Sequence, residues 1–497
     1  MIHSTIASLI ESSCATKADA ELIADENQSL TGRALWTRVS AVALNLHLQG
    51  LRKGDVVAFY SASSVPHAVT FFACLVSGIV PCCLHTRETP ERNKKNIEYI
   101  KAKCLFAEVD LWDSALSLIE EGSIILLSPD FINVEKNSTF NINLAPNDTA
   151  LILISSGTTG VPKCILHSQK TLAATAEYGP YSYGCWSNED STIVVMAPSF
   201  AAWIHTVLPF IFIQGRIFFG SSFDPLIFLK LLEREKITLA PLVPTLWRMV
   251  MAENTEKFDL TNLRVAFFSG EPGSESLVDD LHANICSNIM TSYLASEGGC
   301  ASGIVAGSDI LVGAGQISST GHPVKDAEMQ IINPDGAIDD YLSTGEIGEI
   351  TLKSASIAIG YFDNPALSDK SFHGGWWRSG DLGMIDDKGL LYVKGRLDNR
   401  INTGGIKVHA EDVEASLLKH PLVQLAAVIG VPDKKWGQKI VAHLVVSCND
   451  VDEEEILYYC QKKGLLPKAH LPKEIYFHES LPTGPTGKLY RRGLINL

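Results

Sequence analysis

The chain has 497 residues, of which 46% are hydrophobic and 20% are charged. This composition is typical of a globular protein and excludes a disordered chain. The 56 acidic residues outnumber the 41 basic residues and give a net charge of −15, which argues against a broad surface for nucleic acid. At roughly 150 residues per domain, the length predicts more than one domain.

The most apolar stretch runs from Trp203 to Gly220 and is interrupted by Pro209, Gln214 and Arg216. It never reaches the roughly 20 uninterrupted apolar residues of a membrane-spanning helix, so we expect buried strand or core helix. The N-terminus has no basic segment before an apolar run, so we expect no secretory signal. The eleven cysteines include no C-x-x-C pair. We therefore expect a reduced, cytoplasmic protein without a membrane span.

The first part of the chain alternates apolar runs with helical patterns. Residues 148–155, 191–197 and 264–269 are near-continuous apolar runs, as in strands buried on both faces. Between them, Pro225–Lys236 has one apolar and one charged face, which predicts a helix. This alternation predicts an α/β fold with mostly parallel sheets.

The pattern changes towards the C-terminus. Short strands are expected at 329–333 and 346–352, separated by a turn at Asp335-Gly336, which makes a β-rich patch. A small α+β unit follows, with helices expected at 408–420 and 452–463 and strands at 425–430, 439–447 and 474–477. We place a large N-terminal domain with several subdomains at 1–395, a boundary at 396–400 and a small C-terminal domain at 401–497.

A glycine-rich loop follows the first of the buried strands. It reads Ser155, Ser156, Gly157, Thr158, Thr159, Gly160, Val161, Pro162 and Lys163. Its glycines let the backbone approach a ligand, and its hydroxyls, N–H groups and lysine suit phosphate oxygens. It does not match the Walker A pattern. The alternative is a polar turn between strand and helix, and we favour phosphate binding.

The C-terminal segment Leu481–Arg492 presents Lys488 directly after Gly487. A lysine on such a loop can reach developing negative charge in another domain's cleft. Taken alone, this segment is more often a solvated basic tail.

Together these two segments resemble the adenylate-forming superfamily: acyl- and aryl-CoA synthetases, adenylation domains of peptide synthetases, and luciferases. The loop is similar to S-G-T-T-G-x-P-K, and the tail is similar to L-P-x-T-x-x-G-K-x-x-R-R-x-L. Further similar segments occur in the family's order. They are Leu51–Tyr60, Ser269–Pro272, Tyr293–Glu297, Gly345–Ile350 with Gly360-Tyr361, Trp377–Leu382, and Gly395–Asp398 with Thr403–Val408.

The resemblance implies an enzyme that joins a carboxylate to AMP, releases pyrophosphate and passes the acyl group to a thiol. It implies ATP and Mg²⁺ as cofactors. The resemblance implies that the loop Ser155–Gly160 and Lys163 bind the phosphates of ATP. Adenine would be bound by Tyr293, Gly270, Glu271 and Pro272. Asp381 would bind the ribose, and Arg396 would bind the ribose or a phosphate. Ser296 would bond the α-phosphate, Glu297 would bind the metal, and Lys488 would bridge substrate carboxylate and α-phosphate.

In this family the C-terminal domain is a lid that rotates between the two half-reactions. The resemblance places the hinge at Asp398, within 396–400. One orientation would present Lys488 to the adenylate. The other would present residues 403–407, whose glycines leave room for a pantetheine arm.

Three residues bear on the acid and are weak candidates for the substrate pocket: Ala201, Trp203 and Leu294. Ala201 stands where amino-acid-activating relatives place an aspartate, which disfavours an amino acid. Trp203 would either line the pocket or pack in the core. The substrate is a small-molecule carboxylic acid of undetermined class, and the oligomeric state is undetermined.

The favoured thiol is CoA. The alternative is the phosphopantetheine of a separate carrier protein, loaded by a freestanding adenylation enzyme. A third possibility is a nucleotide-binding protein without turnover, which the retained Lys488, Glu297 and Asp381 disfavour.

Overall fold

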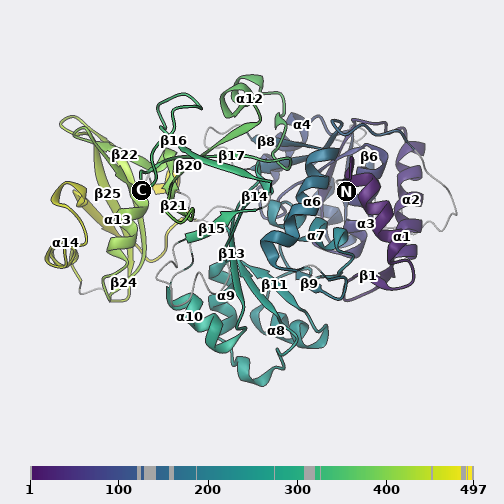
Figure 1. The fold of residues 1–497 in the computed structure, drawn as a ribbon, viewed down its shortest axis with the longest axis horizontal. Helices are drawn as coiled ribbons and strands as arrows, with labels where there is room; N and C mark the ends of the chain where they lie inside the picture. The colour runs from purple at the N-terminus through teal and green to yellow at the C-terminus, as the bar shows by residue number, and fades with distance from the viewer. Residues whose placement is uncertain are drawn as a thin grey trace. The chain divides into compact units, whose positions relative to one another are not determined.

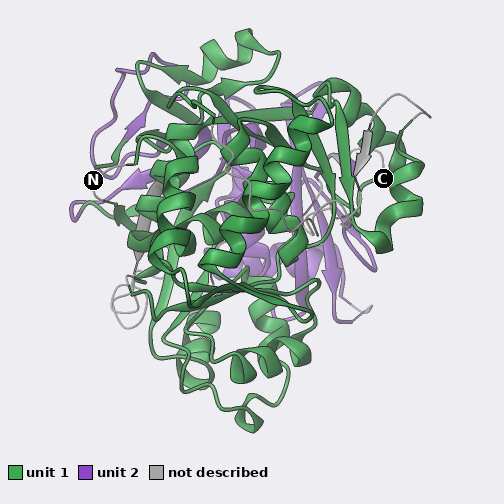
Figure 2. Ribbon diagram, turned by 90° about the vertical axis from the view of Figure 1, so that its right-hand side faces the viewer, with its two compact units in different colours: residues 1–329, 351–378, 389–391 green, residues 330–350, 379–388, 392–497 purple. Residues whose placement is uncertain are grey.

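The computed structural model describes residues 3–119, 125–127, 142–155, 162–185, 187–271, 273, 275–306, 319–324, 326–448, 451–482, 489 and 491–494. Within these ranges the chain forms two compact units, coloured separately in Figure 2. Unit 1 comprises residues 1–329, 351–378 and 389–391, and unit 2 comprises residues 330–350, 379–388 and 392–497.

Unit 1 contains a seven-stranded sheet that is mostly parallel. The two strands at one edge, β8 and β18, run antiparallel to their neighbours. The order across the sheet is β18 (Gly360–Tyr361), β8 (Lys163–Ser168), β7 (Thr149–Ser155), β4 (Val80–Cys83), β3 (Val56–Tyr60), β5 (Cys104–Ala107) and β6 (Ile125–Leu127).

A second set of strands in unit 1 is parallel at its centre and antiparallel at both ends. Its order is β15 (Ser319–Pro323), β14 (Gly299–Ala306), β13 (Ile289–Ala295), β12 (Val265–Phe268), β11 (Leu239–Leu242), β9 (Ser191–Val194), β10 (Arg216–Phe219), β1 (Glu21–Ala24) and β2 (Ser29–Thr31).

The layers of unit 1 follow from the alternation of side chains along these strands. In β3, Val57 and Phe59 face a large core shared with the five helices α1 (Ile6–Thr16), α2 (Gly32–Leu48), α3 (Val65–Ser77), α6 (Gln169–Tyr183) and α7 (Ala201–Phe212) (Figure 1). The alternate residues of β3 face the helices α4 (Pro90–Tyr99) and α5 (Trp112–Leu116).

The second set of strands is likewise buried on both faces. In β12, Val265 and Phe267 join the large core, whereas Ala266 and Phe268 pack with α8 (Pro225–Arg234), α9 (Pro244–Met251) and α10 (Glu275–Asn284). This double burial explains the near-continuous apolar runs of the sequence. The apolar stretch 203–220 contains both of the predicted alternatives: most of helix α7 lies in its first part and strand β10 in its second.

The strands β16 (Glu328–Ile332), β17 (Gly348–Lys353), β20 (Trp376–Ile385) and β21 (Leu391–Arg396) form the predicted β-rich patch, in that order across the sheet. The chain passes between the two units within each of these strands. The division into compact units therefore differs from the predicted domain boundary at 396–400, which remains a prediction.

The C-terminal part of unit 2 has its own core. The strands β23 (Ile406–His409), β22 (Arg400–Thr403), β25 (Gly437–Val446) and β24 (Val423–Asp433) form an antiparallel sheet, and β26 (Glu474–Phe477) adds to β25 in parallel. The helices are α13 (Ala410–Leu417) and α14 (Glu453–Lys462). The prediction of a mixed α/β fold with mostly parallel sheets and a small α+β domain is confirmed.

Candidate functional site

Strand β8 carries two polar side chains on one face. Lys163 is its first residue and pairs with Ser155 of β7, whose hydroxyl donates to the Lys163 carbonyl at 3.3 Å. His167 stands four residues later, which places it on the same side of the strand. Strand β8 then ends at Ser168, where a capping box with Thr171 starts α6. Both ends of β8 are thereby fixed.

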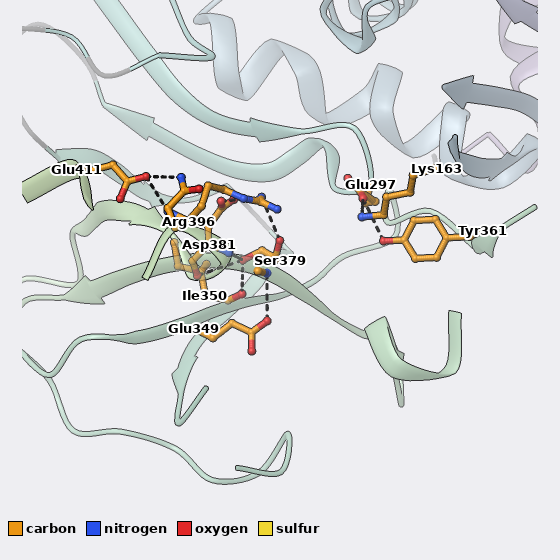
Figure 3. A network of polar contacts seen from close by, with 11 residues as sticks. Lys163, Glu297, Glu349, Ile350, Tyr361, Ser379, Asp381, Arg396 and Glu411 are labelled. Carbon is orange, nitrogen blue, oxygen red and sulfur yellow. Dashed lines mark hydrogen bonds and ion pairs between the residues drawn. The ribbon is translucent and has the colours of Figure 1, made fainter. Parts of the chain in front are cut away.

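The tight turn between β13 and β14 brings Glu297 to this strand. Ala295 and Gly299 pair across the turn. The Glu297 carboxylate oxygen Oε1 lies 2.5 Å from the Lys163 ammonium and accepts a 3.0 Å hydrogen bond from the Tyr361 hydroxyl. The three side chains meet in one cluster, although 134 residues separate Lys163 from Glu297 (Figure 3).

Backbone contacts hold the Glu297 turn in place. His167 Nε2 donates to the Ser296 carbonyl at 2.8 Å; because a carbonyl only accepts, this nitrogen carries the proton. The Ala358 amide donates to the Glu297 carbonyl at 2.7 Å, and the Ser356 hydroxyl donates to the next carbonyl at 2.8 Å. The position of the carboxylate is therefore set by residues from β8 and from the segment before β18.

Burial and charge act against each other in this cluster. Burial by itself would lower the pKa of Lys163, but Glu297 and Tyr361 favour the ammonium, and the pKa is raised. Burial lowers the pKa of His167, partly offset by its bond to the Ser296 carbonyl and by Glu297. The site therefore holds a charged lysine beside a neutral histidine at neutral pH.

A second polar cluster lies within unit 2. Arg396 Nη1 donates to Asp381 Oδ1 at 2.8 Å, so two predicted nucleotide ligands are paired with each other. The Asp381 amide donates to the Ser379 hydroxyl at 2.9 Å. Gly380 adopts φ +69°, and its amide donates to Glu349 at 3.1 Å. These bonds fix the turn that presents Asp381 (Figure 3).

The predicted hinge adjoins this second cluster. Asp398 lies in the short 3₁₀ helix η4 (Leu397–Asn399). Asn399 Nδ2 donates to Glu411 Oε1 of α13 at 2.6 Å. Gly395 has φ +138°, a backbone conformation that L side chains rarely adopt, so this conformation favours glycine.

The predicted adenine and pocket residues lie in unit 1. Tyr293 is buried in β13. Gly270 has φ +85°, and Glu271 Oε2 accepts a 2.9 Å bond from the Thr245 hydroxyl. Ala201 and Leu294 are half-buried and pack against the large core.

Trp203 has the contacts of a core residue. Its exposed fraction is 0%, its ring stacks on Phe219, and its indole N–H donates to the Ser63 hydroxyl at 3.0 Å. Of the two alternatives for Trp203, the contacts favour core packing over a pocket wall.

Several predicted residues lie outside the described part of the chain. They are Ser156, Gly157, Thr158, Thr159, Gly160, Pro272 and Lys488. Within the described part, the structure joins Lys163 with Glu297 and Asp381 with Arg396, in one cluster per unit.

Sequence reasoning gave no role to Tyr361 or His167. Tyr361 belongs to one of the segments that resemble the family, but that segment alone does not assign it a contact. His167 stands in an otherwise apolar strand, four residues from Lys163, and that spacing is the signal that would have pointed to it.

The donor set around Glu297 suits a hard cation that brings other ligands with it. The described residues contain no group of three or more histidines, cysteines, aspartates or glutamates able to hold a metal. Mg²⁺ is commonly bound by one or two carboxylates together with substrate phosphates, rather than by an all-protein cage. The single, largely buried Glu297 carboxylate fits that mode.

Comparison with known proteins bears on the whole chain. Residues 10–362 match the family model described as AMP-binding enzyme, and residues 412–488 match the AMP-binding enzyme C-terminal domain. A probable CoA ligase, CCL5, from Humulus lupulus is 29% identical over 94% of this chain and 88% of its own length.

Two solved structures share the fold. O-succinylbenzoate coenzyme A synthetase (MenE) from Bacillus subtilis, in complex with ATP and magnesium ion, is similar with a TM-score of 0.86 and 22% identity, covering 98% of each chain. The amide bond synthetase McbA from Marinactinospora thermotolerans has a TM-score of 0.88 and 23% identity, covering 99% of each chain. In the described residues, no helix combines the length and apolarity that crossing a bilayer requires.

Proposed function

The chain belongs to the family of AMP-binding enzymes, and on that premise we propose that it converts a carboxylic acid, ATP and CoA into acyl-CoA, AMP and pyrophosphate. It is an AMP-forming acid–thiol ligase. The observation that carries the proposal is the meeting of Lys163 and Glu297 beside the end of β7, where the glycine-rich loop begins. The meeting of the two side chains supports a role for Lys163 as the cation for phosphates and for Glu297 as the carboxylate for Mg²⁺.

The reaction divides into two balanced steps. In the first, a carboxylate oxygen attacks the α-phosphorus, the bond to the β-phosphate breaks, and pyrophosphate leaves. In the second, the thiol sulfur attacks the acyl carbonyl, loses its proton, and AMP leaves. Both steps need alignment and charge screening more than covalent help from the protein.

Unit 1 supplies the charge screening of the first step. Lys163 would move from Glu297 to the β- and γ-phosphates, together with the loop Ser155–Gly160. Glu297 would hold Mg²⁺, which neutralises phosphate charge when it is bound with ATP. Ser296, whose carbonyl is held by His167, would direct its hydroxyl to the α-phosphate.

Several residues are proposed to hold the adenosine. Tyr293 and Gly270–Pro272 are proposed for adenine. The carboxylate of Asp381 can accept both ribose hydroxyls, and Arg396, its partner at 2.8 Å, would then bind ribose or phosphate.

Lys488 is proposed as the catalytic lysine that bridges the substrate carboxylate and the α-phosphate. We expect Lys488→Ala to slow pyrophosphate release by about 10²–10³-fold, the usual effect of losing one preorganised donor. Transfer from a supplied acyl-adenylate to CoA should be largely spared. An equal loss in both half-reactions would refute this role.

The acid and the acceptor are the open parts of the proposal. Ala201 has no charge to hold an ammonium, which favours acids other than α-amino acids. The name of the Humulus lupulus relative supports CoA as the acceptor. A carrier protein's phosphopantetheine is the alternative thiol, and the likeness to an amide bond synthetase makes an amine a third acceptor to test.

A pyrophosphate-release screen over aryl, fatty, small and amino acids would test the proposal. Each acid should be assayed with CoA, with a carrier protein and with an amine. We expect release with a subset of the acids and thioester formation with CoA. Release without CoA dependence but with carrier loading would favour the alternative, and no release with any acid would refute adenylation.

A further inference from the structure

Tyr361 contacts both members of the Lys163–Glu297 pair. Its hydroxyl donates to Glu297 Oε1 at 3.0 Å, and its ring centroid lies 4.5 Å from the Lys163 ammonium. Its exposed fraction is 4%. A buried tyrosine hydroxyl needs a hydrogen-bond partner, and Glu297, the predicted metal ligand, is one of the partners of Tyr361.

Backbone pairing and neighbouring side chains both hold Tyr361 in place. Strand β18 pairs with β8 so that Tyr361 lies opposite Ile165, two residues along from Lys163. The Tyr361 amide donates to the Ser368 hydroxyl of α12 (Pro365–Ser371) at 2.8 Å, and its ring packs on Phe372. The hydroxyl is therefore held at a set position relative to β8.

The same segment also holds the backbone of Glu297. The Ala358 amide, three residues before Tyr361, donates to the Glu297 carbonyl at 2.7 Å. One short stretch of chain thus fixes Glu297 at two points, its carbonyl through Ala358 and its carboxylate through Tyr361. This arrangement sets the direction of the carboxylate as well as its location.

The ion pair must open for the reaction that we propose. Lys163 and Tyr361 both converge on Glu297 Oε1. When nucleotide phosphates draw the ammonium away, the tyrosine hydroxyl is the contact that remains on Oε1. The ammonium can move while staying against the same ring, which attracts a cation on its face.

We propose that Tyr361 is a positioning residue for the adenylation half-reaction: it keeps Glu297 oriented to hold Mg²⁺ after Lys163 has left for the phosphates. This inference rests on the proposed function. Because second-sphere hydrogen bonds orient metal ligands, removing this hydroxyl should weaken the ion's binding without disturbing steps that do not use it.

The test compares Tyr361→Phe with the wild-type protein and with Tyr99→Phe. The first variant keeps the ring and removes only the hydroxyl. Tyr99 is a matched control, because its hydroxyl donates to the Phe362 carbonyl at 3.2 Å, one residue from Tyr361, without contacting Glu297. Thermal melting of all three proteins reports on folding.

The first measurement needs no turnover. Binding of Mn²⁺ in the presence of ATP and without any acid is followed by electron paramagnetic resonance. We expect Tyr361→Phe to bind Mn²⁺ about tenfold more weakly, at the lower end of typical second-sphere effects. Tyr99→Phe should match the wild type. Equal binding by all three proteins would overturn the inference.

The second measurement separates positioning from general damage. In pyrophosphate release, Tyr361→Phe should need about tenfold more Mg²⁺ for half-maximal rate, with kcat at saturating Mg²⁺ nearly restored. Transfer from a supplied acyl-adenylate to CoA should be unchanged. A lower melting temperature with equal loss in both half-reactions would mean a structural role and would overturn the inference.

The proposed function has its own point of failure. A wild-type protein that releases no pyrophosphate with any acid would refute adenylation, and the role of Tyr361 would fall with it. A wild-type protein that is active, beside a Tyr361→Phe variant with unchanged Mn²⁺ and Mg²⁺ dependence, would refute the role of Tyr361 alone.

Discussion

The two polar clusters pair the same kinds of charge in different ways. In unit 1, Lys163 and Glu297 are 134 residues apart, and their side chains are 30% and 10% exposed. In unit 2, Arg396 and Asp381 are 15 residues apart, and the arginine side chain is 49% exposed. The first pair joins β8 to the turn between β13 and β14, whereas the second connects the neighbouring strands β20 and β21.

The two clusters also differ in how the surrounding backbone holds them. The backbone carbonyls of Glu297 and of its two neighbours in the chain each accept a hydrogen bond, from Ala358, His167 and Ser356. Arg396 is the first residue of the predicted hinge segment 396–400, and its backbone amide donates to Glu411 Oε1 of α13 at 3.5 Å. The comparison suggests a fixed site for charge in unit 1 and an adjustable one in unit 2. The predictions that follow test this difference.

The largest expected effect is that of Glu297→Gln. Glutamine keeps the shape but loses the charge that Lys163 and Mg²⁺ need, so pyrophosphate release should fall by about 10²–10³-fold. The matched change in unit 2, Asp381→Asn, should cost about tenfold, as expected for a single weakened hydrogen bond. A greater loss for Asp381→Asn would reverse the proposed ranking of the clusters.

Unit 2 also contains a buried ion pair, and breaking it should cost stability. Arg491 Nη2 lies 2.9 Å and 2.7 Å from the two oxygens of Glu414, whose exposed fraction is 8%. Arg491→Met would leave that buried carboxylate without its cation, although the Val428 amide still donates to it at 2.8 Å, and should lower the free energy of unfolding of unit 2 by about 3 kcal/mol. Denaturant unfolding would measure this change.

An exposed pair in unit 1 provides the control for Arg491→Met. Arg33 and Asp19 are 2.9 Å apart with side chains that are 69% and 85% exposed. Arg33→Met should therefore cost at most about 1 kcal/mol. Equal losses for the two variants would mean that the Arg491–Glu414 pair contributes little.

The hinge prediction sharpens the idea of an adjustable unit 2. The φ angles of a 3₁₀ helix, about −50 to −70°, are compatible with proline. Asp398→Pro should therefore fit η4 as described but restrict rotation at that residue. One half-reaction should fall at least about tenfold more than the other, a difference of about 1.4 kcal/mol in barrier. Single-turnover assays of each step would measure this, and equal losses would argue against a hinge at Asp398.

The smallest expected effect is the change in the stability of unit 1 for each pH unit of acidification. Burial lowers the pKa of His67 to about 3, and the pKa values of His167 and His205 are also lowered by burial. Because the folded pKa of His67 lies below its usual value of 6.5, the unfolded chain binds the extra proton. Stability is full above pH 6.5 and falls as the pH drops towards 3, by about 1.4 kcal/mol per pH unit for this histidine.

The variant His67→Asn isolates that contribution. Asparagine retains a polar group near the Ser61 hydroxyl, which lies 2.7 Å from His67 Nδ1. The dependence of the unfolding free energy on pH between 5 and 6.5, followed by urea denaturation, should become shallower, by up to about 1.4 kcal/mol per pH unit at the acid end of this range. An unchanged slope would mean that His67 is protonated in the folded state.

Much of the fold could be predicted from local patterns. The helix predicted at 452–463 appears as α14 (Glu453–Lys462), and the strand predicted at 474–477 is β26. The apolar run 264–269 appears as β12. These elements follow from periodicity and from burial on one or both faces, which are properties of short segments. The apolar stretch 203–220 stayed ambiguous, because a fully buried helix and a fully buried strand look alike in sequence.

Some residues of the candidate site could be predicted from local patterns, and others could not. Lys163, Glu297, Asp381 and Arg396 could be chosen from the sequence because each lies in a recognisable motif. Their partners could not, because a hydrogen bond between residues far apart in the chain leaves no local pattern. Tyr361 and His167 acquire a role only when β18 and the β13–β14 turn are placed against β8.

The sequence by itself determined the layered α/β class, the family and the residue types that handle phosphate, metal and ribose. Tertiary structure alone decided which of these residues share a site, that Trp203 packs in the core, and that Tyr361 contacts both charges of unit 1. The physical reason is that composition and period act over a few residues, whereas the geometry of a site depends on the register between strands that are distant in the chain.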